Sequence, residues 1–168
     1  LQVVVAASAL LDRFGSVVDI VAADGFNINA RVHMIIEGET PTTMAKSTGL
    51  GLLELPTLLD QLKPDVVVTV GDRFETIATA IAAAYMNIPL AHTMGGEISG
   101  TIDESVRHAI TKLAHLHFPA NQKAADRIMR MGEDPDVIHV VGCPRIDLVA
   151  EIAQENSRLP ERAWLEYE

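Results

Sequence analysis

Residues 89–118 read PLAHTMGGEISGTIDESVRHAITKLAHLHF. A short apolar strand leads into Gly95-Gly96 and then into a helix whose first turn carries Asp103 and Glu104, and three histidines and an arginine follow. A packing element does not need so many ionisable groups beside a loop that lets a ligand approach the backbone. The stretch is therefore predicted to form one wall of an active site.

Strand-like apolar runs alternate with helical patterns on both sides of this stretch. The predicted strands are residues 2–7, 30–36, 65–70, 88–92, 116–119 and 137–141. The predicted helices are residues 17–23, 42–62, 73–86, 101–115, 121–131 and 145–154. Pro56 is expected to kink the second helix or to divide it in two. Strands separated by helices at this spacing are typical of βαβ units, so the predicted fold is α/β with a doubly wound, mainly parallel sheet.

The carboxyl edge of that sheet is the predicted place of the site. Right-handed crossovers bring the carboxyl ends of parallel strands to one edge, where ligands bind. The loops after Val70, His92 and Val141 all leave from this edge and are the richest in glycine and ionisable residues. Residues 73–86 form a helix that is apolar on most faces, which predicts burial by the sheet and by a partner subunit.

Composition narrows the classes of partner. The chain has 168 residues, enough for one domain with a real core, and a net charge of −10 from 13 basic and 23 acidic residues. No basic run occurs, so neither nucleic acid nor an anionic membrane is an expected partner, while local arginines and helix N-termini still allow an anionic small ligand. No signal peptide is expected, and no apolar run reaches the roughly 20 residues of a membrane span. A lone cysteine, Cys143, fits a reducing cytoplasm.

The loop after residue 70 reads Gly71-Asp72-Arg73-Phe74-Glu75. Glycine permits a tight strand-to-helix turn, and Asp72 can cap the helix through a backbone N–H. In isolation, Asp72 would be only a cap and Arg73 only a surface residue. Their position at the carboxyl edge, beside a second acidic loop, favours a ligand-binding role.

The helix of residues 101–115 carries a second set of candidates. Thr101 and Glu104 fit a capping box, and the helix dipole stabilises Asp103 as an anion. Helical spacing pairs Asp103 with Arg107 and Glu104 with His108. The predicted sheet-facing residues are Ile102, Val106, Ala109, Ile110 and Leu113. Asp103, Arg107 and His108 are then expected to lie toward the loop, where a ligand can meet them.

The glycines and His92 have more than one interpretation. Gly95-Gly96 before Glu97 indicates a positive φ, a close approach of a ligand, or a flexible turn. His92 ends a buried strand, where a histidine is either a hydrogen-bonded core group or a site residue.

Metal, cofactor and thiol chemistry are not predicted. His115 and His117 have no carboxylate or cysteine at a supporting spacing, so they do not indicate a metal site. No cofactor is expected. Cys143 lies in Gly142-Cys143-Pro144-Arg145 and is expected to be a buried structural thiol. The glycine motifs of phosphate-binding loops and of the serine-hydrolase elbow do not occur.

Together these motifs resemble the hydrolysing UDP-N-acetylglucosamine 2-epimerases, which begin the synthesis of sialic-acid-type sugars. The resemblance runs over about residues 2–152 and is densest at residues 71–75, 95–117 and 142–144. GGE, SGTIDES and RHAITKLAH are hard to obtain together by chance. The non-hydrolysing epimerases share the fold but have a different motif in the second loop.

The resemblance implies two Rossmann-like domains across a cleft, as in glycosyltransferase-B folds, with UDP held mainly by the C-terminal domain. Residues 1–155 are then expected to be the N-terminal Rossmann-like domain without its first strand. Residues 156–168 are expected to be a terminal helix or the start of an interdomain linker. The C-terminal nucleotide-binding domain is expected to be absent, which predicts an inactive fragment. The family also implies a cytoplasmic homo-oligomer, a dimer or a tetramer.

The implied reaction is an anti elimination of UDP across C1–C2 of the sugar, followed by hydration of the glycal to free N-acetylmannosamine. Asp72 and Asp103 match the family's catalytic aspartates. The family has a catalytic glutamate two residues after its site histidine, where this chain has Met94. Either Glu97 or a water replaces that glutamate, or the substrate is a modified one, or catalysis is impaired. Val70 stands where a histidine often precedes Gly-Asp-Arg. The expected substrate-binding residues are Arg73, His92, Gly95, Gly96, Ser99, Arg107 and His108.

Two other functions fit part of the pattern. Met94 favours a non-catalytic relative that binds sugar nucleotides or has a regulatory role. A stand-alone flavodoxin-like module would bind Mg²⁺ at the acidic loops for phosphoryl transfer, and it requires a complete sheet without a second domain.

Overall fold

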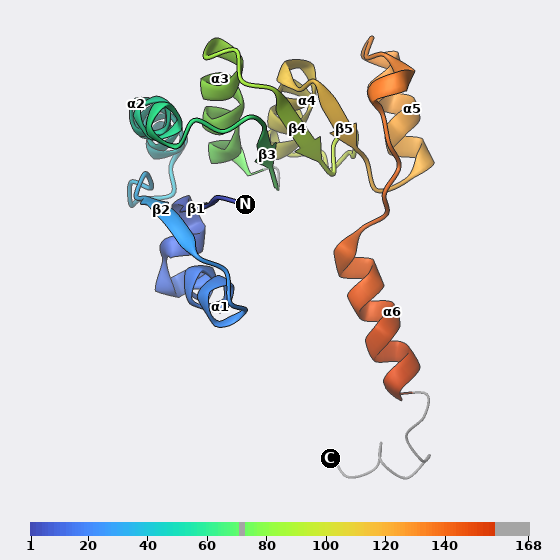
Figure 1. Cartoon of the computed structure of the whole chain (residues 1–168), viewed down its shortest axis with the longest axis horizontal. Helices are drawn as coiled ribbons and strands as arrows, with labels where there is room; N and C mark the ends of the chain where they lie inside the picture. Colours follow the sequence, from blue (N-terminus) through green and yellow to red (C-terminus); the bar gives the residue numbers. More distant parts are fainter. Residues whose placement is uncertain (71–72, 157–168) are drawn as a thin grey trace.

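The computed structural model describes residues 1–70 and 73–156, and these residues form an α/β fold with parallel strands (Figure 1). β1 pairs with β2, and β3, β4 and β5 form a second ladder in that order. Their bounds are β1 Val3–Ala6, β2 Ile28–Val32, β3 Val67–Thr69, β4 Leu90–Thr93 and β5 Leu116–Phe118. The predicted α/β class with parallel βαβ connections is confirmed.

Helices connect the strands along the described chain. The α-helices are α1 Val17–Ala23, α2 Pro41–Leu62, α3 Ile77–Tyr85, α4 Ile102–Leu113, α5 Gln122–Arg130 and α6 Pro144–Asn156. Short 3₁₀ turns are η1 Ala7–Leu10, η2 Asp12–Phe14, η3 Phe74–Thr76 and η4 Pro135–Val137. Of these turns, η1 and η3 directly follow β1 and the loop after β3, at the carboxyl edge.

The predicted strand at residues 137–141 is wrong. The segment makes one parallel bridge, between His117 of β5 and Ile138. The N–H of His139 donates to the carbonyl of His117 at 2.8 Å, and the N–H of Val141 donates to that of Pro119 at 3.1 Å. Because η4 occupies the preceding residues, the chain meets the sheet edge only from Ile138 onward.

Pro56 lies inside one continuous helix, α2, so the expected division into two helices is wrong. Thr40 caps this helix reciprocally with Thr43, and proline stands in the first turn, where its missing N–H has no cost. Leu55 and Leu59, on either side of Pro56, are buried in the core. The burial of these leucines stabilises the helix against the backbone hydrogen bond that Pro56 lacks.

α3 lies at the centre of the core, and the prediction that it is buried on more than one side is confirmed. Its buried alanines are Ala78, Ala80, Ala82 and Ala83. α2 and α4 of the same chain pack against it and supply this burial, and a contact with a partner subunit stays a prediction. A Cβ on Gly51 of α2 would lie 2.9 Å from the Cβ of Ala78, and this glycine therefore allows the close approach of α2.

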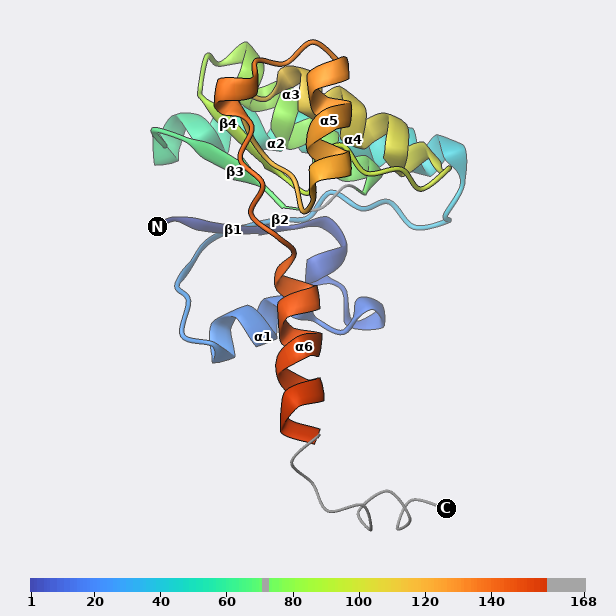
Figure 2. The same ribbon diagram turned by 90° about the vertical axis from the view of Figure 1, so that its right-hand side faces the viewer.

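α6 projects from the rest of the described chain (Figures 1 and 2). Its exposed apolar residues are Ile146, Leu148, Val149 and Ile152. Cys143, just before the helix, is only half-buried, so the prediction of a buried thiol is wrong.

Candidate functional site

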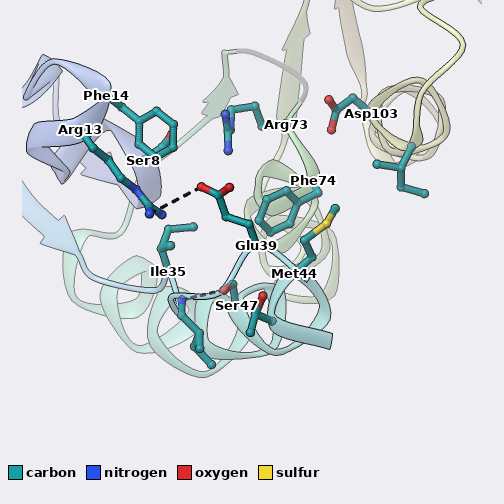
Figure 3. A pocket seen from close by; sticks show the side chains of 13 residues that line it. Ser8, Arg13, Phe14, Ile35, Glu39, Met44, Ser47, Arg73, Phe74 and Asp103 are labelled. Carbon is teal, nitrogen blue, oxygen red and sulfur yellow. Dashed lines mark hydrogen bonds and ion pairs between the residues drawn. The ribbon is translucent and has the colours of Figure 1, made fainter. Parts of the chain in front are cut away.

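The carboxyl ends of β1, β2 and β3 and the first turn of α4 surround a cavity of about 360 Å³ (Figure 3). Its polar and aromatic lining includes Arg13, Phe14, Glu39, Arg73, Phe74 and Asp103. A cavity thus lies at the carboxyl edge of the parallel strands, where the sequence predicts a site.

Arg73 and Asp103 come from different loops and line the same cavity. In Figure 3 the Asp103 carboxylate extends from α4 toward Arg73. This confirms the prediction that the loops after Val70 and His92 meet. Residues 142–145, in the loop after Val141, do not line the cavity. Asp72 lies outside the described residues.

The guanidinium of Arg73 is held from several directions. Its Nε donates to Oε1 of Glu75 at 3.0 Å. Its Cζ lies 5.3 Å from the ring centroid of Phe14 and 5.9 Å from that of Phe74, which are cation–π distances. The side chain of Arg73 is 49% exposed, whereas that of Glu75 is 7% exposed. The half-exposed guanidinium of Arg73 is therefore paired with the buried carboxylate of Glu75 at the cavity wall.

Sequence reasoning missed the contribution of the η2 turn. Arg13 and Phe14 both line the cavity, and the Cζ of Arg13 lies 5.0 Å from the Phe14 ring centroid. Arg13 also pairs with Glu37 at 2.9 Å and with Glu39 at 3.6 Å. Arg13 and Phe14 follow β1, and Glu37 and Glu39 follow β2. The rule that ligands bind at the carboxyl ends of parallel strands, which was applied to the later strands, could therefore also have identified these residues.

The first turn of α4 differs from the predicted capping box. Thr101 is the N-cap residue, but its side chain makes no capping hydrogen bond. Instead, Oε2 of Glu104 accepts from the N–H groups of Ser99 and Gly100, each at 2.7 Å. The hydrogen bonds from Gly100 and Ser99 lower the pKa of Glu104. Glu104 therefore orders the loop before Asp103.

The predicted apolar face of α4 needs one correction. Val106 and Ile110 are buried as expected, but Ile102 is 57% exposed and lines the cavity beside Asp103. Ile102 begins the helix, where the loop side of the first turn faces the cavity rather than the sheet. His108 lies 3.9 Å from Glu104, as the helical spacing predicts.

Two arginine side chains donate hydrogen bonds to backbone carbonyls of the loop that contains Gly95 and Gly96. Arg107, only 5% exposed, donates to the carbonyl of Glu97 at 2.7 Å. Arg127 of α5 donates to the carbonyl of Gly96. Burial lowers the pKa of Arg107. Neither Arg107 nor Glu97 lines the cavity, so their contacts order the loop rather than form the cavity wall.

Close packing accounts for both glycines of the loop. A Cβ on Gly95 would lie 3.0 Å from Nδ1 of His92 and 3.1 Å from Oγ1 of Thr111. Gly96 has a φ of 78°, and a Cβ there would overlap the carbonyl oxygen of Ala124 in α5. The close approach predicted at this loop is made by the protein's own atoms. Ser99, by contrast, is exposed.

His92 is a buried group, 1% exposed, and does not line the cavity. Thr111 donates its hydroxyl to the carbonyl of Arg107 at 3.1 Å, so Nδ1 of His92, at 3.2 Å, is the donor to Thr111. Nε2 is buried without a hydrogen-bond partner among the described residues. Burial, with smaller contributions from His117 and His108, lowers the pKa of His92 to about 4. The neutral imidazole is therefore a core group beneath the loop.

In residues 1–70 and 73–156, no three histidine, cysteine or acidic side chains are grouped as ligands of one ion. Among the helices of the same ranges, none has the length and apolar character needed to cross a bilayer.

Comparison with known proteins decides the family. The family profile described as UDP-N-acetylglucosamine 2-epimerase matches residues 1–166. The chain belongs to the UDP-N-acetylglucosamine 2-epimerase family. It is 42% identical over 138 residues to the UDP-N,N'-diacetylbacillosamine 2-epimerase (hydrolyzing) of Legionella pneumophila, a match that covers 82% of the chain and 37% of that relative. It is 33% identical over 150 residues to the UDP-N-acetylglucosamine 2-epimerase of Neisseria meningitidis, covering 89% and 39%.

Solved epimerase structures share the fold. A crystal structure of a UDP-N-acetylglucosamine 2-epimerase superposes with a TM-score of 0.71 at 26% identity, over 83% of the chain and 37% of that protein. The Neisseria meningitidis enzyme bound to UDP-GlcNAc has a TM-score of 0.74 at 19% identity, over 94% and 42%. The chain thus spans about two fifths of the length of these epimerases. Membership of the epimerase family excludes the flavodoxin-like module considered above.

Proposed function

We propose that the chain is the N-terminal part of a hydrolysing UDP-N-acetylglucosamine 2-epimerase. The main support for this function is that Arg73 and Asp103, from two separate loops, line one cavity at the carboxyl edge of the strands. The similarity to a hydrolysing relative at 42% identity supports the subtype. Residues 1–155 are then proposed to form its Rossmann-like N-terminal domain. A C-terminal domain would hold most of the nucleotide, and residues 1–168 alone would be inactive.

The proposed reaction removes the C2 proton and the UDP group from opposite faces of the sugar. Water then adds to the glycal and releases free N-acetylmannosamine. Asp103 supplies a carboxylate at the cavity wall, and Asp72, next to Arg73, is proposed as the second catalytic aspartate. Glu97 is the proposed third acid, but it faces the cavity only if the loop held by Arg107 rearranges. We further propose a cytoplasmic homo-oligomer that takes part in sialic-acid-type sugar synthesis.

The other proposed substrate-binding residues differ in how deeply they are buried. Arg73 reaches the cavity directly. Ser99 and His108 lie at the loop surface or half-buried on α4, where a second domain could bring a ligand. His92, Gly95, Gly96 and Arg107 are buried beneath the loop, and their proposed role is to hold its shape under the substrate.

The full-length gene product tests this proposal when it is incubated with UDP-N-acetylglucosamine and, separately, with UDP-N,N'-diacetylbacillosamine. Release of UDP together with the free 2-epimeric sugar supports a hydrolysing enzyme, and the preferred substrate assigns the acyl pattern. Formation of UDP-N-acetylmannosamine would instead place the protein with the non-hydrolysing enzymes.

A second candidate function is a non-catalytic sugar-nucleotide-binding relative, which Met94 favours. Met94 has a φ of 60° directly after β4, and its side chain cannot transfer a proton. Binding of the sugar nucleotide without release of UDP is the expected result for this candidate. Asp103→Asn would then change the affinity and leave no rate to lose.

A further inference from the structure

Glu75 is a buried carboxylate whose role is not explained by the proposed chemistry. It is 6% exposed, although glutamate rarely is so deeply buried without a partner. Its Oε1 accepts from Nε of Arg73 at 3.0 Å and from the hydroxyl of Ser8 at 3.4 Å. Its Oε2 is buried without a hydrogen-bond partner among the described residues. A buried anion of this kind must keep its cation close, because an unpaired buried charge is strongly unfavourable.

The contact with Glu75 constrains how Arg73 can present its remaining donors. A guanidinium is planar, with its five N–H donors in a rigid fork, so fixing Nε fixes the direction of both terminal nitrogens. Phe14 and Phe74 restrict the group further through the ring contacts described above. Within residues 1–70 and 73–156, no hydrogen bond involves the terminal nitrogens of Arg73. Figure 3 shows the guanidinium pointing into the cavity.

We propose that Glu75 is a positioning residue that holds the Arg73 fork toward the diphosphate of a sugar nucleotide in this cavity. The choice of ligand rests on the proposed function. Phosphate oxygens match a planar fork through paired hydrogen bonds, and Arg73 forms the fork without reorganisation when the ligand arrives. Arg13 is less suited to this role, because Glu37 and Glu39 already pair with it.

The competing explanation is a purely structural one. Ser8 follows β1 and Glu75 follows β3, so their hydrogen bond links the carboxyl ends of the two ladders. A linking role predicts that removal of Glu75 lowers stability without a specific effect on the mobility of Arg73 or on diphosphate binding. The two explanations therefore differ in what Arg73 does once Glu75 is replaced.

The first experiment follows the Nε–H of Arg73 by NMR in the full-length protein, with its signal assigned by its loss in Arg73→Lys. The hydrogen bond to Glu75 is expected to give a slowly exchanging signal. Glu75→Met, which keeps the side-chain length but has no acceptor, is expected to abolish this protection. Glu75→Gln keeps one acceptor oxygen and should retain part of it. Full protection in Glu75→Met would overturn the proposal.

The second experiment measures UDP binding by calorimetry in a double-mutant cycle. Glu75→Met and Arg73→Gln should each weaken UDP binding about tenfold, the scale of a lost charged hydrogen bond, and the double variant should bind no more weakly than Arg73→Gln. Additive losses would refute a role that acts through Arg73. Glu133→Gln is the matched control, because it removes a mostly buried carboxylate that pairs with Lys112 away from the cavity, and its UDP affinity should be unchanged.

The outcomes separate this inference from the proposed function. Tight UDP binding that depends on Glu75, without turnover of UDP-N-acetylglucosamine, would refute the enzyme and support the positioning role. Turnover of UDP-N-acetylglucosamine by the parent protein, with a UDP affinity that is unchanged in Glu75→Met, would support the proposed enzyme and refute the positioning role of Glu75. Should Glu75→Met fail to fold, Glu75→Gln serves for both measurements, with a smaller expected loss.

Discussion

The buried state of His92 makes a quantitative prediction about the pH dependence of stability. Folding lowers the pKa of His92 from 6.5 to about 4, mainly through burial. Between these two values the unfolded chain binds a proton that the folded chain does not. The contribution to stability is therefore complete above about pH 6.5 and is lost progressively as the pH falls toward 4. At about 1.4 kcal/mol per pH unit, the loss between pH 7.5 and pH 5 is about 2 kcal/mol.

The assay compares urea unfolding of the parent protein with that of His92→Gln at both pH values. Glutamine is neutral throughout, so the variant should lose about 2 kcal/mol less than the parent over this interval, whatever its stability at pH 7.5. His33→Gln, at an exposed position, is the matched control for the replacement of a histidine by glutamine. Acidic groups such as Glu104 titrate alike in all of these proteins and cancel in the comparison.

A direct titration of the His92 ring by NMR gives an independent result. The imidazole should remain neutral at pH 5.5 and titrate near pH 4. Titration near pH 6.5, together with parallel stability curves for the parent and His92→Gln, would refute the inference that His92 is a neutral core group. It would instead restore His92 as a candidate for proton transfer at the site.

Three further changes test the loop, the second helix and the proposed chemistry. Gly96→Ala should lower the free energy of unfolding by about 2–4 kcal/mol, because a Cβ at a φ of 78° overlaps the Ala124 carbonyl; an unfolding midpoint unchanged in urea would contradict this packing. Thr40→Ala removes the cap of α2 and should cost about 1 kcal/mol in the same assay, whereas a loss below the error would mean that Thr43 caps the helix alone. Asp103→Asn should reduce the kcat of UDP release about 100-fold or more with little change in the melting temperature, and a retained kcat would exclude Asp103 as an acid or base.

Local patterns account for the parts of the fold that the sequence predicted well. The helices at residues 17–23 and 121–131 match α1 Val17–Ala23 and α5 Gln122–Arg130 to within one residue at each end. Side-chain periodicity and capping residues act over one or two turns, so they can be read without knowledge of the tertiary structure. The segment at 137–141 has the apolar character of a strand, but the η4 turn takes up its first residue and the remainder makes a single bridge to β5.

The site was only partly predictable for the same reason. Arg73 and Asp103 were recognised because each follows a predicted strand, and the parallel topology brings such loops together. Phe14 and Ser8 escaped attention, since neither forms a motif with its neighbours in the sequence. Glu75 was noticed only as the last residue of the Gly71-Asp72-Arg73-Phe74-Glu75 motif and was given no role. Ser8 and Glu75 lie 67 positions apart, and their contact exists only after the two ladders have packed.

From the order of residues alone came the α/β class, the edge at which a site forms and the likeness to the epimerases. These follow from periodicity and from motifs that are continuous along the chain. Tertiary packing decided that His92 and Arg107 lie beneath the loop, that the double glycine accommodates α5, and that Glu75 is buried beside Ser8. Burial and charge pairing depend on residues that are distant in the sequence, and those neighbours are assigned only when the helices and strands come together.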